Sequence, residues 1–269
     1  MSRFLLTLCL ITRFCIAQNW VNYNFNNSVH KLYYSTGTNK LFISGAFTKI
    51  NNVNISGIAS YDGVHFDSLG CGINYTTSVV SVKDLDEYKN ELYICGGISY
   101  MGTTRTKNIA KWNGLRWDSL GTQLNSRVNA LKVFNNELYV GGNFWLCGTQ
   151  PANAIIKYDG TNWIPIGNGI PFNTGGQAIV FDIEAFNNEI YVAGVFYDNM
   201  GNEFQLAKFD GTNWHKVLSL NSSLHEINTL KVYNGALYIG GRFLTTSGDP
   251  GNLIAKFDGT NWIPLGSGI

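Results

Sequence analysis

Charged residues are scarce in this sequence. Asp, Glu, Lys and Arg make up 14% of its 269 residues, and the formal net charge is +1. Proteins that bind nucleic acid or anionic membranes concentrate Lys and Arg on one surface, because attraction to phosphate provides much of their affinity. A dilute and balanced charge therefore argues against nucleic acid as a partner.

Long apolar runs are also missing, except for one at the N terminus. The apolar stretch Phe4–Thr12 follows Arg3, and Cys15 and Ala17 place small residues at −3 and −1 of a cleavage point. This pattern predicts a secretory signal peptide, residues 1–17. A membrane anchor needs about 17–25 apolar residues, and Arg13 interrupts the run too early. We therefore predict a secreted or cell-surface protein without membrane insertion.

Cysteine and histidine are few, and no CxxC pair suggests a metal site. Removal of the leader would leave Cys71, Cys95 and Cys147, with 17 Lys and Arg against 18 Asp and Glu. Export permits disulfides, but an odd number leaves one thiol over, and the pairing stays open. Cys95 stands where the other repeats described below carry Ser, Gly or Ala, so we expect a small buried residue there.

What the sequence does have is an internal repeat. An apolar–aromatic–apolar–x–Gly pattern occurs five times, and its leading residues are separated by 51, 46, 52 and 47 positions. A fixed period near 48 residues is typical of stacked supersecondary units. The five copies are Leu41–Gly45, Leu92–Gly96, Leu138–Gly142, Ile190–Gly194 and Leu237–Gly241.

A second pattern repeats in step with the first. An aromatic residue is followed by Asp-Gly (Asn-Gly in the second unit), and another aromatic always stands five positions after the first. We predict that these later aromatics are structural and pack between neighbouring units, because each buries about 150–250 Å². They are Phe66, Trp117, Trp163, Trp214 and Trp262.

Each unit divides into four strands. In the third unit we expect them at Val128–Phe134, Glu137–Phe144, Ala154–Tyr158 and Asn162–Ile166. Asn135-Asn136 and the Asp-Gly-Thr-Asn segment supply hairpin turns, since Asn and Gly tolerate positive φ. No stretch shows a helical period. We predict an all-β fold, a single β-propeller domain over residues 18–269, with five four-stranded blades near residues 28–73, 78–124, 126–170, 176–220 and 224–269.

The glycine pair, the aromatic and the tryptophan together resemble the kelch repeat. Gly141-Gly142, Tyr158 and Trp163 follow the kelch order with a spacing one residue shorter, and Gly240-Gly241, Phe257 and Trp262 do the same. The repeat sequences are also similar to those of large secreted bacterial propellers that often end in a type IX sorting tag, and no such tag is present. The resemblance implies kelch-like blades.

The strand count leaves the ring open to two interpretations. Asn19-Trp20 matches the last strand of a unit, as in Asn162-Trp163, so one leading strand precedes five complete units. Either the chain is an incomplete ring or part of a larger one, or the leading strand adds to a ring of five blades.

The two longer connections of every unit should emerge on one side of the ring and vary in sequence. Binding residues concentrate on loops held by a rigid scaffold. We therefore predict binding through this variable side, with Arg105, Trp145 and Tyr197 as contacts. The segments are Lys49–Asn54, Met101–Lys107, Trp145–Asn153, Asp198–Glu203 and Thr245–Gly251.

Known propeller enzymes offer no match. Sialidases need an arginine triad and an Asp-box whose acid and glycine are separated, whereas Asp159 and Gly160 are adjacent. Galactose oxidase binds copper through His and Tyr. The remaining arginines (Arg105, Arg116, Arg127, Arg242) and the histidines (His30, His65, His215, His225) lack the required spacing. One carboxylate per turn is too few for calcium. We predict no catalytic residue, metal or cofactor.

The leading hypothesis is therefore a non-catalytic binding or scaffold propeller that recognises protein or carbohydrate. A carbohydrate-active enzyme is one alternative, favoured by paired carboxylates about 5–10 Å apart in a pocket. An architectural segment of a larger surface protein is the other.

Overall fold

The computed structural model describes residues 22–70, 72–73, 81–121, 124–167, 169–170, 178–222 and 224–268. The expected signal peptide, the leading strand at Asn19–Trp20 and Cys71 lie outside the described residues.

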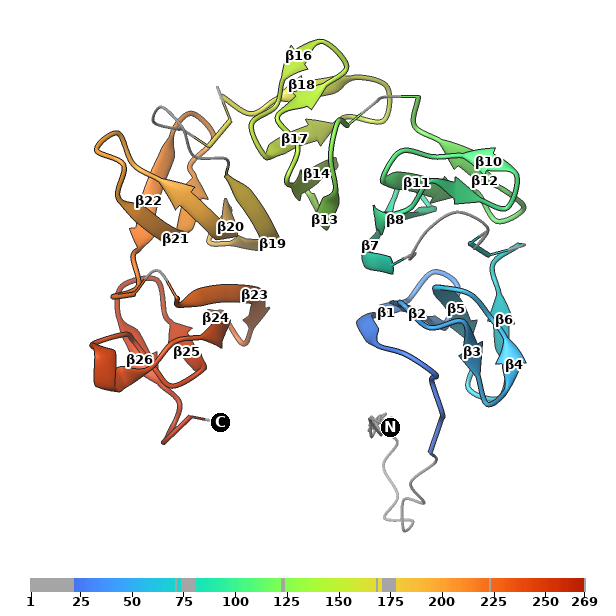
Figure 1. The fold of residues 1–269 in the computed structure, drawn as a ribbon, viewed down its shortest axis with the longest axis horizontal. Coiled ribbons are helices and arrows are strands. Elements are labelled where there is room, and N and C mark those ends of the chain that lie inside the picture. The colour runs from blue at the N-terminus through green and yellow to red at the C-terminus, as the bar shows by residue number, and fades with distance from the viewer. Residues whose placement is uncertain are drawn as a thin grey trace.

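Five four-stranded antiparallel sheets form the blades of a β-propeller (Figure 1). Blade 1 contains β1 (Val29–Ser35), β2 (Lys40–Gly45), β5 (Ile58–Tyr61) and β6 (Phe66–Ser68); blade 2 contains β7 (Ser81–Tyr88), β8 (Glu91–Gly97), β11 (Ile109–Trp112) and β12 (Trp117–Ser119). Blade 3 contains β13 (Val128–Phe134), β14 (Glu137–Gly142), β17 (Ile155–Tyr158) and β18 (Trp163–Pro165). Blade 4 contains β19 (Ile179–Phe186), β20 (Glu189–Tyr197), β21 (Glu203–Phe209) and β22 (Trp214–Leu218); blade 5 contains β23 (Glu226–Tyr233), β24 (Ala236–Arg242), β25 (Ile254–Phe257) and β26 (Trp262–Pro264). The predicted fold class is confirmed.

Short hairpins extend the connection between the second and third strands of the first three blades, and the sequence did not predict them as strands. They are β3 (Lys49–Ile50) with β4 (Val53–Asn54), β9 (Tyr100–Met101) with β10 (Thr104–Arg105), and β15 (Leu146–Cys147) with β16 (Gln150–Pro151). In blade 5 a 3-10 helix, η1 (Thr245–Ser247), takes this place. It is too short to span a bilayer, and no membrane-spanning helix occurs among the described residues.

The turns have the chemistry that the sequence indicated. Asn135 and Asn136 adopt φ of 48° and 57° between β13 and β14. In the following hairpin the Asp159 carboxylate accepts hydrogen bonds of 2.7 Å from the backbone N–H groups of Thr161 and Asn162. An Asp or Asn that bonds the backbone two residues ahead fixes a tight turn without any ligand. This local role accounts for the repeated Asp-Gly.

Each innermost strand carries a β-bulge at the same place. A bulge inserts one unpaired residue and increases the local twist of the strand. The register shifts lie between Val29 and Lys31, Val82 and Asp84, Val128 and Ala130, Val180 and Asp182, and Ile227 and Thr229. The repeat is therefore conserved at the level of strand irregularities as well as strands.

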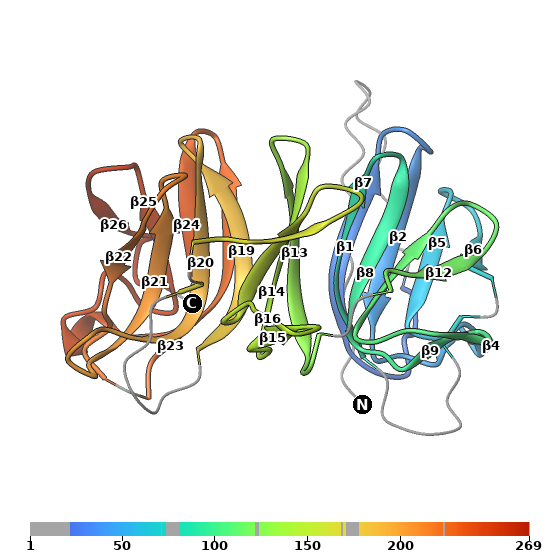
Figure 2. The same ribbon diagram turned by 90° about the horizontal axis from the view of Figure 1, so that it is seen from above.

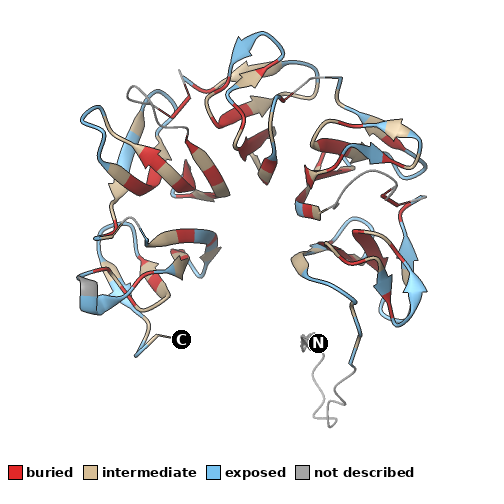
Figure 3. Ribbon diagram, in the orientation of Figure 1, coloured by how far each residue is buried: buried red, intermediate tan, exposed pale blue. Residues whose placement is uncertain are grey.

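Blades pack face to face because side chains alternate in direction along a strand. In blade 2, Leu92 and Ile94 belong to the apolar cluster shared with blade 1, whereas Tyr93 and Cys95 belong to the cluster shared with blade 3. Cys95 is fully buried, as expected, and its thiol is unpaired, like that of Cys147. Buried residues accordingly concentrate where neighbouring blades face each other (Figure 3).

The blades surround a centre lined by the first strand of each, β1, β7, β13, β19 and β23, and each of these strands contacts the next. Figure 1 shows an arc, with blades 1 and 5 at its two ends. The short strands β4, β9, β15 and β16 lie on one side of the ring, which we call the loop face (Figure 2). The turns within the strand pairs lie on the other side, the hairpin face.

Candidate functional site

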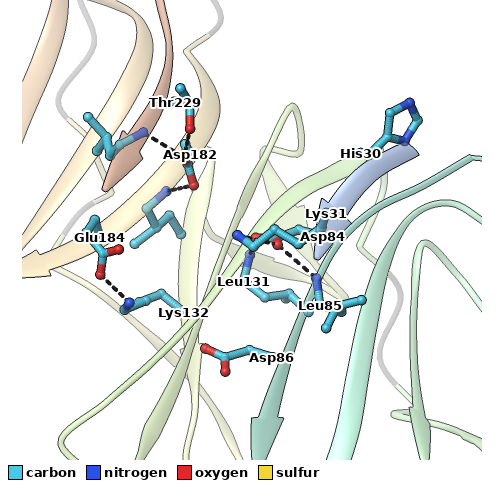
Figure 4. Close-up of polar contacts among 12 residues, drawn as sticks. His30, Lys31, Asp84, Leu85, Asp86, Leu131, Lys132, Asp182, Glu184 and Thr229 are labelled. Atoms are coloured by element: carbon cyan, nitrogen blue, oxygen red, sulfur yellow. Dashed lines mark hydrogen bonds and ion pairs between the residues drawn. The ribbon is translucent and has the colours of Figure 1, made fainter. Parts of the chain in front are cut away.

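Charged side chains gather on the innermost strands. They occupy the position just after the bulge and the position two residues further on, and we call this set the axial belt (Figure 4). Its members are Lys31, Asp84, Asp86, Lys132, Asp182, Glu184 and Lys231. The sequence analysis did not single them out, although their fixed place in the repeat was visible.

Asp84 links three blades. Its Oδ1 lies 2.8 Å from Lys31 Nζ of blade 1, and its Oδ2 accepts a 2.9 Å hydrogen bond from the backbone N–H of Leu131 in blade 3. The backbone N–H of Leu85 bonds the same carboxylate at 2.8 Å. Asp86 repeats the pattern, since its Oδ2 accepts a 2.7 Å bond from Val133. A carboxylate bonded in this way connects the edges of two separate sheets.

Asp182 does the same between blades 4 and 5. Its Oδ2 accepts bonds from the Thr229 hydroxyl at 3.0 Å and from the backbone N–H of Leu230 at 2.7 Å. Burial, followed by the negative charge of Asp84, raises the pKa of Asp182 to about 6, although Lys31 and the hydrogen bonds oppose this. Two carboxylates close together in a partly desolvated place repel each other, so one of them binds its proton more tightly.

Glu184 completes the belt. It forms an ion pair with Lys132 of blade 3 and lies 3.7 Å from Lys231 of blade 5. The Glu184 side chain is 7% exposed and that of Lys132 is 24% exposed. Every carboxylate of the belt therefore has protein partners from an adjacent blade, so the belt helps to hold the blades together.

The loop face exposes large apolar side chains. Each blade contributes one, and in each case it comes from the connection between the second and third strands. The exposed fractions are 59% for Val53, 38% for Tyr100, 48% for Trp145, 86% for Met200 and 42% for Leu244. We call these five the loop-face apolar set. Because a backbone-bonded hairpin or turn holds each one, they stand on a rigid support.

The three contacts predicted from the sequence lie in three different blades. Arg105 is exposed in β10 of blade 2, and Trp145 directly precedes β15 of blade 3. Tyr197 ends β20 of blade 4 and pairs with Glu203. The structure thus places all three on the loop connections, but it does not bring them together into one pocket. Their role in binding stays a prediction.

Trp145 is held through its backbone. Its N–H donates to Asn125 Oδ1 at 3.0 Å, and its carbonyl accepts the N–H of Ala152 at 2.9 Å. These bonds fix the main chain, while the indole remains half exposed.

A small pocket of about 170 Å³ lies in blade 4 beside Tyr197. Its lining includes Asp198, Trp214, His215 and Lys216. The Asp198 carboxylate is already hydrogen-bonded within its own turn, because Oδ1 accepts the N–H groups of Met200 and Asn202 at 3.0 and 2.9 Å. Those bonds, the Asn202 bond first, lower the pKa of Asp198. The pocket therefore offers three aromatic rings (Tyr197, Phe204 and Trp214), the Lys216 ammonium and a single carboxylate, but no pair of opposed carboxylates.

The histidines are separate from one another. His30 Nδ1 lies 2.9 Å from the carbonyl of Val82, and burial lowers its pKa. His215 Nε2 lies 2.6 Å from Asp210, within one hairpin. In the described ranges no three His, Cys, Asp or Glu side chains come together as metal ligands.

The fold defines the chain as a five-bladed β-propeller. No protein-family model matches it, and no curated protein matches it either. The likeness to kelch repeats, and to propellers with a sorting tag, therefore stays a prediction.

Three solved structures are similar in fold. The extracellular domain of the putative hybrid two-component system BT4673 from B. thetaiotaomicron is 15% identical with a TM-score of 0.46, over 88% of this chain. The chain spans 32% of that structure, about a third of its length. The structure of YjhT is 10% identical (TM-score 0.49, covering 78% of this chain and 75% of that one). YCF48 bound to D1 peptide is 12% identical (TM-score 0.47, 92% and 68%). At these identities and TM-scores the structures say nothing about ligand or activity.

Proposed function

We propose that this chain is a non-catalytic, extracellular or cell-surface binding propeller that recognises its ligand through the loop face. The observation that carries the proposal is the loop-face apolar set, one large exposed side chain from the same connection of every blade. The five side chains come from equivalent connections and therefore lie on the same side of the ring, where a ligand can contact several of them.

A protein ligand fits this arrangement better than a small sugar. The five side chains come from five different blades, so a ligand that contacts several of them must extend across the ring. Aromatic residues and Met are also the residue types enriched at protein interfaces, and the set contains Tyr100, Trp145 and Met200. Carbohydrate binding remains the second ligand class, supported by the exposed indole of Trp145.

The carbohydrate-active alternative has less support. Its expected feature was a pair of carboxylates in a pocket on the loop face. Asp84 and Asp182, whose charges interact, lie instead on the innermost strands and bond backbone N–H groups of the next blade.

The test uses the folded chain, a random-peptide display library and a glycan array as probes. Binders are selected on the wild-type chain and then measured on two triple variants. One changes the loop face (Tyr100→Ala, Trp145→Ala, Met200→Ala). We expect at least a tenfold loss of affinity for selected peptides, since a buried anchor contributes about 1.4 kcal/mol or more.

The matched control removes apolar side chains that are equally exposed on the hairpin face and the inner strand, with Val64→Ala, Leu115→Ala and Tyr34→Ala. Their exposed fractions are 72%, 89% and 53%. Peptide binding should survive in this control. Selected ligands that tolerate the loop-face variant but not the control would place the site on the other side and overturn the proposal. Hits confined to the glycan array would move the assignment to carbohydrate.

A further inference from the structure

The two end blades expose surfaces that every internal blade buries. On the side of each blade that faces the next one, three equivalent positions are buried in blades 1 to 4. These positions are Phe42, Ser44 and Ile58; Tyr93, Cys95 and Ile109; Tyr139, Gly141 and Ile155; and Tyr191, Ala193 and Leu206. In blade 5 the same positions, Tyr238, Gly240 and Ile254, are all partly exposed. We call them the fifth-blade face.

Gly240 lies on this face beside an unfilled space, which we call the socket. A methyl group added at Gly141 would lie 2.5 Å from Val180 Cγ1 of the next blade, because Val180 fills the space beside it. At Gly240 the nearest atoms belong to the same blade, Thr229 Cγ2 at 3.0 Å and the Leu253 carbonyl at 3.9 Å. Among the described residues, no side chain takes at Gly240 the place that Val180 takes at Gly141.

The innermost strands show the same difference. The residue after the bulge position is at most 4% exposed in blades 2 to 5, at Leu85, Leu131, Ile183 and Leu230, but Leu32 in blade 1 is 41% exposed. At the other end of the arc Tyr233 is 64% exposed, whereas its equivalent Tyr88 is 1% exposed. Blades 1 and 5 thus each expose a surface that forms one half of an interface in the internal blades.

The N-terminal segment indicates what belongs between these halves. Residues 22–27 lie against blade 1 as the exit segment of each blade lies against the following blade. Phe25 bridges to Ile50 in blade 1, just as Ile73 at the exit of blade 1 bridges to Met101 in blade 2, and Leu124 bridges to Cys147. Residues 22–27 therefore occupy the place of a preceding blade's exit.

An aromatic contact supports the same assignment. The Tyr23 ring packs edge-on against Phe66 at 4.8 Å. In the next interface the exit residue Gly70 lies against Trp112 and Trp117, the aromatic pair equivalent to Tyr61 and Phe66.

The segment that leaves blade 5 has the same geometry as the segment that leaves blade 3. Gly268 donates its N–H to the Leu265 carbonyl at 3.0 Å, as Gly169 does to Ile166 at 3.0 Å before the chain enters blade 4. Both glycines have positive φ, 88° and 75°. The chain thus leaves blade 5 along the path that leads from blade 3 into a further blade.

We propose that the free faces of blades 1 and 5 together bind one further blade of the same repeat. Such a blade would place its first three strands after the exit of blade 5 and its fourth strand before residue 22, where the sequence predicts one at Asn19–Trp20, outside the described residues. The proposal concerns the architecture of the ring and goes beyond the ligand-binding function. A second five-bladed copy does not fit, because the ends of the arc point toward the same opening (Figure 1) and a copy on blade 5 would meet blade 1.

The fifth-blade face also specifies the sequence of its occupant. It matches the face of blade 3 in four residues: Tyr238 for Tyr139, Gly240 for Gly141, Ile254 for Ile155 and Lys231 for Lys132. Blade 4 docks on blade 3 by placing Val180 at the glycine and Glu184 against the lysine. The sixth blade should therefore supply a β-branched residue to Gly240 and an acidic residue to Lys231.

The experiment adds such a blade. A copy of residues 171–209, which contains β19, β20 and β21, is fused after Ile269 of the full chain. Hydroxyl-radical footprinting then compares the fused and unfused proteins at Leu32 and Tyr233. We expect at least a fivefold loss of labelling at both side chains, and a melting temperature higher by about 4 °C or more. Labelling unchanged at both residues would overturn the proposal.

Two controls keep the outcome unambiguous. Val180→Asp with Glu184→Lys, made only in the added copy, should abolish the protection. Gly240→Val in the host chain fills the socket; it should leave the unfused protein intact, since no following blade contacts Gly240, but prevent docking in the fusion. If the unfused chain dimerises in sizing and the dimer protects Leu32 and Tyr233, a second copy is the occupant and the proposal fails.

Discussion

The indole Nε1 of Trp117 donates a hydrogen bond of 2.9 Å to the carbonyl oxygen of Leu69, 48 residues earlier and one blade away. Trp214 repeats this relationship with Ile166 at 3.3 Å, again across 48 residues. In blades 2 and 4 the repeated aromatic therefore has two roles. It packs against its own hairpin partner, as the tilted rings of Trp117 and Trp112 do at 5.2 Å between centroids, and it bonds the exit segment of the preceding blade. In blade 3 the buried Nε1 of Trp163 has no hydrogen-bond partner among the described residues.

Replacing Trp117 tests this double role. Trp117→Phe keeps an aromatic ring but removes one of the two hydrogen bonds to the Leu69 carbonyl, which also accepts the Gly72 N–H at 3.2 Å, and this should lower the free energy of unfolding by about 0.5–1.5 kcal/mol. Trp117→Ala also opens a cavity and should cost about 3–5 kcal/mol. Urea unfolding followed by fluorescence gives both values. Trp262→Phe is the matched control, because Trp262 is more exposed at the end blade and should cost less; an equal loss in both would contradict the interpretation.

The Lys31–Asp84 pair should be energetically coupled. Asp84→Ala leaves the Leu131 N–H and the Lys31 ammonium without their acceptor, and loss of one partner of a buried pair costs about 3–5 kcal/mol. Because the Lys31 side chain is 38% exposed, we expect the lower end of that range. A double-mutant cycle with Lys31→Met should give a coupling free energy of about 1 kcal/mol or more. A coupling near zero would show that Asp84 acts only through its backbone bonds.

The axial belt should make stability depend on pH. Burial raises the pKa of Asp182 to about 6, above the value of about 3.9 for an unfolded Asp. The folded state then binds the proton more tightly, so the contribution of Asp182 to stability is largest below pH ~4 and declines as pH rises to ~6. Lys31, Asp84 and Thr229 are the charged and polar groups that face it.

In Asp182→Asn, the urea concentration at the unfolding midpoint should depend less on pH between pH 4 and pH 6.5 than in the wild type. The control is Asp210→Asn. The backbone N–H of Asn213, followed by His215, lowers the pKa of Asp210 to about 2, so its contribution is present above pH ~4 and is lost as pH falls further. Asp210→Asn should change the urea midpoint only where the pH falls below ~4. A wild-type slope retained in Asp182→Asn would refute the assignment.

Ala154 occupies a backbone position that favours glycine. Its φ is +69°, and the equivalent residue in blade 1 is Gly57, also at +69°. Since a side chain in this region carries a penalty of about 1 kcal/mol, Ala154→Gly should raise the melting temperature or leave it unchanged, even after the greater entropy of glycine in the unfolded chain. The reverse change, Gly57→Ala, places a methyl 2.3 Å from Ile73 Cδ1 and should destabilise. Calorimetry of both variants checks that Gly57→Ala lowers the melting temperature and that Ala154→Gly does not.

Much of the fold could be predicted because the repeat encodes it locally. Strand ends, Asn-Asn and Asp-Gly turns, and the aromatic pair five residues apart all depend on neighbours in sequence, and five copies make each signal visible. In blade 3, β13 matches its predicted span Val128–Phe134 in full. The extra hairpins such as β9 with β10 were missed, since two-residue strands have no periodicity to detect.

Which side chains are exposed on the loop face could be predicted only in part, for a related reason. Placing Arg105, Trp145 and Tyr197 on loop connections followed from strand alternation, but which side chains stay exposed depends on how each connection folds back. That Tyr100 and Met200 are exposed, like Trp145, is seen only in three dimensions.

By itself, then, the sequence determined the blade, because its hairpins and alternating faces need only contacts within about 48 residues. The tertiary structure alone decided what happens between blades. The partners of Asp84 and Asp182, the socket at Gly240 and the exposure of Leu32 depend on which face meets which neighbour. Identical local patterns therefore end in buried interfaces inside the arc and in open faces at its ends.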